Sequence, residues 1–107
     1  MPIIEPEVLM DGDHSIMECF KVTSEVLKAV YSECRIQGVV LSGTILKPNM
    51  VLPGKESRGA LADEVAKLTC EALQQNVPKD VAGIAFLSGG QSDYDATNHL
   101  NLSLIHI

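Results

Sequence analysis

Residues 43–54 read GTILKPNMVLPG, an apolar run that ends in a lysine and continues at once into a proline. The run begins earlier, at residues 39–46 (VVLSGTIL), which are rich in β-branched side chains and flanked by turn signals, as is typical of a buried strand. Lysine is rarely buried without a partner, so Lys47 at the end of such a strand calls for an explanation. Ligands of parallel α/β sheets bind beyond the carboxyl ends of the strands, and Lys47 is therefore a candidate for a functional site.

The segments on either side of this stretch repeat one pattern. Residues 2–9 predict a first strand and residues 83–87 (GIAFL) predict a third. Apolar residues spaced three and four apart predict helices over about residues 16–34 and 61–75, with Asp13 as N-cap of the first. Ser92 with Asp95 resembles a capping box that opens another helix. Strands that alternate with helices indicate an α/β fold of three consecutive parallel βα units.

Composition excludes several classes of protein. The chain has 107 residues, enough for one small domain, and its net charge of −6 disfavours a general nucleic-acid binder. An apolar run of about 18 residues, which a membrane span needs, is absent from the sequence, and no signal peptide is evident. The cysteines are odd in number and lack C-x-x-C spacing, which predicts neither a disulfide framework nor a zinc site, and suggests a reducing, cytosolic compartment. They are Cys19, Cys34 and Cys70.

Polar residues or glycines lie toward the carboxyl end of each of the three predicted strands. In chain order these are Glu5 and Glu7, then Lys47, then Ser88, Gly89 and Gly90. A lysine in such a place can attack a carbonyl to form a Schiff base, a glutamate can move the protons, and backbone N–H groups before a helix can bind an anion. Taken singly, each feature is more often a rim lysine, a solvated strand end or a plain turn. Their shared position at three strand ends predicts one common site.

Four segments carry a resemblance to a known family: IIEPEVLMDGDH, GTILKPNMVLPG, VPKDVAGIAFLSGGQS and ATNHLNL. In this order and spacing they resemble class I fructose-1,6-bisphosphate aldolase over about residues 2–102. The resemblance implies a (β/α)8 TIM barrel, of which this chain would hold strands five to seven. It also implies a lyase of glycolysis that reversibly cleaves fructose 1,6-bisphosphate to dihydroxyacetone phosphate and glyceraldehyde 3-phosphate in the cytoplasm.

The resemblance also assigns roles to the residues at the strand ends. Lys47 is implied to form the Schiff base, Glu5 to transfer protons and Glu7 to support the lysine, while residues 88–90 would bind a substrate phosphate. The family uses no metal and no cofactor, binds a phosphorylated sugar and forms homo-oligomers at full length. The scattered histidines are accordingly not expected to be ligands; they are His14, His99 and His106.

The chain also departs from the family. A closed barrel needs about 250 residues, so 107 residues can supply only part of one. We therefore expect residues 1–102 to form a partial barrel domain, residues 103–107 to be a tail that does not match the family, and the isolated chain to self-associate through open sheet edges. We also expect the chain alone to be inactive, because two carboxylates favour the charged form of a lysine and a nucleophile must be neutral.

Two other interpretations stay open at this point. One is another Schiff-base barrel, such as a transaldolase or a deoxyribose-phosphate aldolase, although the LKPNMV and SGGQS context fits these less well. The other is a non-catalytic truncated product that associates with full-length subunits.

Overall fold

The computed structural model describes residues 1–103. In chain order its elements are β1 (Ile3–Ile4), α1 (Ile16–Ile36), the 3-10 turn η1 (Leu41–Gly43), β2 (Ile45–Leu46), α2 (Ala62–Asn76), β3 (Gly83–Ile84) and α3 (Asp93–Ser103). The strands form one sheet in the order β1-β2-β3, and both neighbouring pairs are parallel. Helices α1 and α2 make the crossovers. The predicted α/β fold of three consecutive parallel βα units is confirmed.

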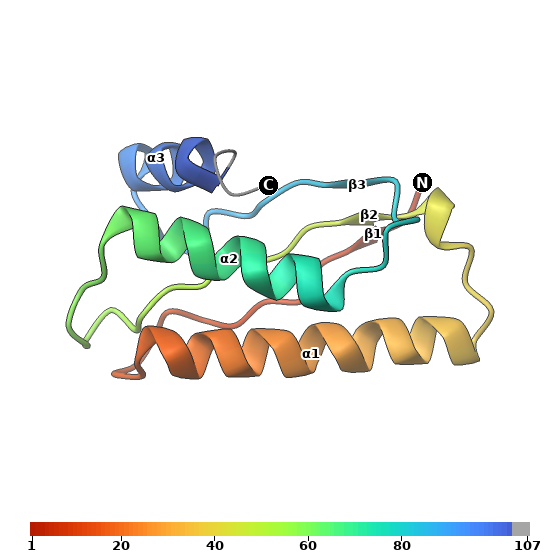
Figure 1. The fold of residues 1–107 in the computed structure, drawn as a ribbon, viewed down its shortest axis with the longest axis horizontal. Helices are drawn as coiled ribbons and strands as arrows, with labels where there is room; N and C mark the ends of the chain where they lie inside the picture. The colour runs from red at the N-terminus through yellow and green to blue at the C-terminus, as the bar shows by residue number, and fades with distance from the viewer. Residues whose placement is uncertain (104–107) are drawn as a thin grey trace.

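The helices cover one face of the sheet. In Figure 1, α1 and α2 lie side by side and run opposite to the strands, and α3 packs against α2. Between helices and sheet lies a core that includes the fully buried Leu27 and Leu46. In the described residues the other face of the sheet is uncovered, and Ile3 on that face is 61% exposed. Ile84 is paired with Leu46 and therefore faces the helices, yet it is still 43% exposed at the edge of the sheet.

The strands are shorter than their sequences predict. Each regular strand is two residues long, whereas residues 2–9, 39–46 and 83–87 were expected to be extended. Residues 41–43 form a 3-10 turn instead of strand, with the Thr44 side chain donating to the carbonyl of Leu41 at 2.8 Å. Beyond the regular strands single ladder bonds continue: Lys47 N–H donates to Ile4 O (2.7 Å) and Leu87 N–H to Pro48 O (3.1 Å). The three extended segments therefore stay in register up to the carboxyl-end rim of the sheet.

Helix α1 begins at a different cap from the one predicted. Ser15, not Asp13, is the N-cap, and its Oγ accepts a hydrogen bond from Glu18 N–H at 3.1 Å. Serine followed three residues later by glutamate has the spacing of a capping box, so the prediction of Asp13 was wrong by two residues. Helix α2 ends at Asn76, two residues before Pro78, as the sequence predicts. Ser92 caps α3 as expected, its Oγ accepting from Asp95 N–H at 3.1 Å.

Two further expectations concern a membrane-spanning segment and the C-terminal tail. In the part of the chain that the structure describes, no helix combines the length and apolarity that crossing a bilayer requires. Of the predicted tail, Ser103 is the last residue of α3 and is buried, whereas residues 104–107 lie outside the described residues.

Candidate functional site

Lys47 and Glu5 form an ion pair at the carboxyl-end rim of the sheet. Lys47 Nζ lies 3.5 Å from Glu5 Oε1, and the two side chains are 41% and 48% exposed. The pair is thus half-buried and open to solvent on the uncovered face. A primary amine next to a carboxylate provides both a nucleophile for a carbonyl and a group that can move protons.

The register of the sheet explains why these two residues meet. Side chains alternate between the two faces of a strand. Leu46 is fully buried toward the helices, so the next residue, Lys47, falls on the opposite, uncovered side. The bond from Lys47 N–H to Ile4 O then places the lysine beside the residue that follows Ile4, which is Glu5.

The second glutamate lies near the glycine loop at the end of the third strand. Glu7 Oε2 is 3.9 Å from the position that a Cβ on Gly89 would occupy. Gly89 and Gly90 have φ values of +61° and +90°, in the region that favours glycine, and the turn is closed by Gln91 N–H donating to Ser88 O at 3.1 Å. This loop leads directly to the Ser92 cap of α3. Backbone N–H groups at such a turn and helix start are suited to an anion.

The structure therefore brings the predicted site residues to one rim, in two contacts. Glu5 pairs with Lys47, and Glu7 lies by Gly89. The ends of the second and third strands are joined by the bond from Leu87 N–H to Pro48 O, directly beside Lys47 and Ser88 in the chain. Ser88 itself is exposed.

Asn49 is a residue of this rim that the sequence reasoning missed. Its side chain is 6% exposed and joins three segments: its Oδ1 accepts from Val8 N–H at 3.2 Å, and its Nδ2 donates to Thr23 Oγ1 at 3.2 Å and to Met50 O at 2.9 Å. It therefore fixes the chain after Glu7 to the chain after Lys47. The available signal was a polar amide inside the apolar run of LKPNMV.

Gln91 was also missed, and it supports the glycine loop. Its Nε2 donates to Ser88 O at 3.1 Å, and its Oε1 hydrogen-bonds Nδ1 of the buried His99. Burial lowers the pKa of His99, and the carboxylate of Asp95 opposes this in part. Gln91 and His99 thus tie the loop to α3.

Metal ligation has little support in the described residues. Among residues 1–103, no three His, Cys, Asp or Glu side chains lie close enough together to hold an ion. His99 is a buried hydrogen-bonding residue of α3, and His106 falls outside the described residues. The cysteines within the described part are free thiols of α1 and α2.

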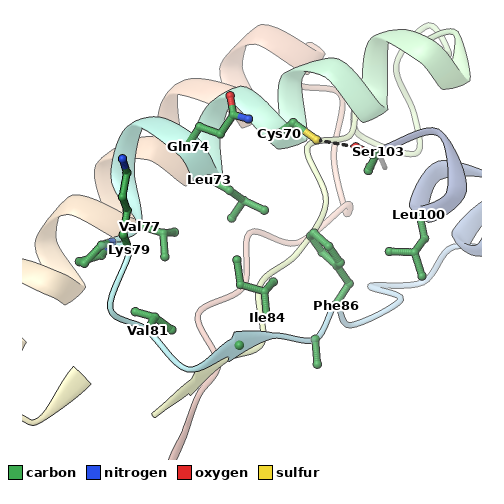
Figure 2. Close-up of a pocket in the computed structure, with 13 residues that line it drawn as sticks. Cys70, Leu73, Gln74, Val77, Lys79, Val81, Ile84, Phe86, Leu100 and Ser103 are labelled. Atoms are coloured by element: carbon green, nitrogen blue, oxygen red, sulfur yellow. Dashed lines mark hydrogen bonds between the residues drawn. The ribbon is translucent and has the colours of Figure 1, made fainter. Parts of the chain in front are cut away.

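An apolar pocket lies away from this rim. It measures about 580 Å³, is mainly apolar and lies between α2, β3 and α3, with Leu73, Ile84, Phe86 and Leu100 among its lining residues (Figure 2). Neither Lys47 nor the glycine loop lines it. We assign the candidate site to the rim because chemistry-bearing side chains gather there.

Comparisons with known proteins agree with the motifs. Residues 1–104 match the family described as glycolytic fructose-bisphosphate aldolase class-I. The chain is 50% identical over 101 residues to fructose-bisphosphate aldolase 6, cytosolic, of Arabidopsis thaliana, covering 94% of this chain and 28% of that protein. It is 49% identical over 106 residues to fructose-bisphosphate aldolase of Drosophila melanogaster, covering 99% of this chain and 29% of that protein.

A solved structure gives the same result for the fold. The fructose-bisphosphate aldolase of Plasmodium falciparum, in a complex with TRAP and a small-molecule inhibitor, superposes with a TM-score of 0.94 at 44% identity. The match covers 96% of this chain and 30% of that one. The chain thus spans somewhat less than a third of the length of each of these relatives.

Proposed function

This chain belongs to the class I fructose-bisphosphate aldolase family, and on that premise we propose that it carries the Schiff-base segment of an aldolase site. In this proposal Lys47 is the nucleophile, Glu5 moves protons, Glu7 supports the site, and Ser88, Gly89 and Gly90 bind a phosphate of the substrate. The ion pair between Lys47 and Glu5 at 3.5 Å, placed at the shared rim, is the observation that carries the proposal.

The chemistry follows from the amine and the neighbouring carboxyl group. The Lys47 amine, in its neutral form, adds to the ketone carbon of a sugar phosphate, and the carbonyl oxygen becomes the hydroxyl of a carbinolamine. Glu5, as a carboxylic acid, gives a proton to that hydroxyl, which leaves as water and yields the iminium ion. The Glu5 carboxylate left by that transfer then takes the proton of the hydroxyl group on the carbon that becomes the aldehyde. The electrons of the breaking carbon–carbon bond move into the iminium, giving an enamine while the aldehyde departs.

The activity belongs to a complete barrel, of which this chain has three βα units. We propose that the longer protein cleaves fructose 1,6-bisphosphate in the cytosol as a homo-oligomer, as relatives named cytosolic or cytoplasmic isozymes suggest for the compartment. The described part of the chain alone leaves Lys47 open to water on an uncovered sheet face, so we expect residues 1–107 on their own to be inactive. The family match favours a fructose-bisphosphate aldolase over other Schiff-base barrels.

A chimera tests the proposal. Residues 1–101 would replace the matching segment of the Arabidopsis relative, and cleavage of fructose 1,6-bisphosphate would be measured. We expect the chimera to be active. Its Lys47→Arg variant should lose at least about a thousandfold in activity, since an arginine cannot form the Schiff base. Borohydride with dihydroxyacetone phosphate should attach the reduced adduct to Lys47 in the chimera only. A folded chimera whose Lys47→Arg variant keeps full activity would refute the proposed role.

A second function is favoured by one observation. In the described residues β1 and β3 are both edge strands, and Ile3 is exposed on the uncovered face while Ile84 is partly exposed on the helix side of the other edge. These surfaces suit a chain that associates with other barrel segments or subunits without catalysis. Mixing the chain with a full-length relative and finding no co-elution in size-exclusion chromatography would remove this alternative.

A further inference from the structure

We infer that Lys55 is the cation that receives the phosphate group at the glycine loop, and that it selects phosphorylated over unphosphorylated substrates. This inference rests on the proposed function. Lys55 Nζ and Cε lie 3.2 Å and 3.3 Å from the position that a Cβ on Gly90 would occupy. The ammonium group therefore lies directly over the bare backbone of the loop, although it is 35 residues away in the chain.

The backbone around Lys55 is fixed even though it lies in a loop. Lys55 N–H donates to Met10 O at 2.7 Å, and the neighbouring N–H groups of Gly54 and Glu56 donate to His14 O and Gly12 O, both at 2.9 Å. These three bonds attach the loop after β2 to the turn after β1. The position of the Lys55 backbone is thus set by the sheet connections and not by chance contact.

Most charged side chains at the rim are acidic, and Lys55 is a cation there with only a weak ion pair. The acidic groups there are Glu5, Glu7 and Asp11, and Lys47 is already paired with Glu5. Lys55 Nζ pairs with Asp11 Oδ1 at 3.9 Å, with side chains 53% and 78% exposed, which is a long and solvated ion pair of little strength. A phosphate monoester, with close to two negative charges at pH 7, would compete well for this ammonium group. The loop N–H groups and the ammonium group would then bind the same phosphate.

The line width of the ³¹P NMR signal of inorganic phosphate, titrated with the 107-residue chain, tests this inference and does not depend on catalysis. Because this line width also rises with particle size, all variants are compared at one protein concentration at which they elute alike from size-exclusion chromatography. We expect Lys55→Gln to weaken phosphate binding by about three- to tenfold, as for a partly exposed charge pair with a dianion. Lys55→Arg should retain most of the affinity. The matched control is Lys79→Gln, which removes the same charge before β3, at the opposite end of the sheet, and should change nothing.

Gly89→Ala distinguishes phosphate binding by the glycine loop from phosphate binding by Lys55, because it strains the loop at φ +61° without touching Lys55. We expect it to weaken binding as well. If Gly89→Ala weakens binding while Lys55→Gln does not, the loop binds phosphate and our inference about Lys55 is wrong. If Lys55→Gln weakens binding while Gly89→Ala does not, Lys55 attracts phosphate only as a surface charge and the inference is again wrong. No binding by the unmodified chain would refute both Lys55 and the proposed phosphate loop, leaving the role of Lys47 to the chimera.

Discussion

At the scale of single residues, the buried Asn49 joins segments that are far apart in the chain. Asn49→Ala would leave the Val8 N–H and the Thr23 hydroxyl without this partner, so we expect a loss of about 2–3 kcal/mol in the free energy of unfolding. Urea denaturation followed by circular dichroism would measure it. Asn101→Ala, at an exposed position of α3, is the control and should cost little. Equal effects of the two substitutions would show that the Asn49 hydrogen bonds do not stabilise the rim.

His99 should make the stability depend on pH. Burial lowers its pKa below the ordinary value of about 6.5, so between these two values the unfolded chain binds a proton that the folded chain does not. Stability from this residue is therefore complete above pH 6.5 and falls as the pH drops toward the lowered pKa. Urea midpoints at pH 7.5 and 5.5 should differ more for the unmodified chain than for His99→Gln. Identical pH dependence of the two would exclude His99 as the source.

The sequence predicted the rim residues that carry chemistry but not those that hold them in place. Lys47 and Glu5 could be found because charged side chains stand out at the ends of apolar runs. Asn49 and Gln91 could not, because their partners lie elsewhere: Asn49 bonds Val8 from 41 residues away, and Gln91 bonds a histidine on the next helix. Hydrogen bonds of this kind depend on tertiary structure and leave little periodic signal.

At the scale of elements, helices were predicted more accurately than strands. Helix α2 was expected over about residues 61–75 and is found at Ala62–Asn76, because apolar residues spaced three and four apart and a following proline define it well. The apolar composition of residues 39–46 predicted a longer strand than β2, since β-branched residues favour extended backbone wherever they pack. Residues 41–43 instead turn, and the Thr44 hydroxyl bonds back to Leu41.

The contact between the loops after β1 and β2 yields a prediction about Gly54. A Cβ there would lie 2.3 Å from Gly12 O, which is backbone and cannot rotate away. We expect Gly54→Ala to destabilise the fold by about 1–3 kcal/mol, as overpacking does, and to displace Lys55. Gly59→Ala is the matched control, because nothing lies within 4 Å of the added methyl group. Thermal unfolding would compare them, and a Gly54→Ala chain as stable as the Gly59→Ala chain would show that the two loops can separate freely.

At the scale of the whole molecule, the open sheet predicts self-association. Within residues 1–103 both edge strands are unpaired on one side, and the uncovered face carries Ile3, which is 61% exposed. We expect the chain to elute from size-exclusion chromatography as oligomers whose share rises with concentration. Ile3→Lys should reduce that share, whereas Leu61→Lys, at an exposed leucine directly before α2, should reduce it less. A sharp monomer peak with cooperative melting would contradict this expectation.

The parallel order of the sheet has a consequence for biosynthesis. Ile3 pairs with Ile45, and Ile45 in turn pairs with Gly83, so each strand pair can form only after a partner distant in the chain has been synthesised. On the ribosome, α1 can form early, whereas the ion pair of Lys47 with Glu5 requires the second strand, and the glycine loop cannot dock until the third has left the exit tunnel. Such non-local pairing slows folding and lengthens the time that nascent apolar strands are exposed to chaperones.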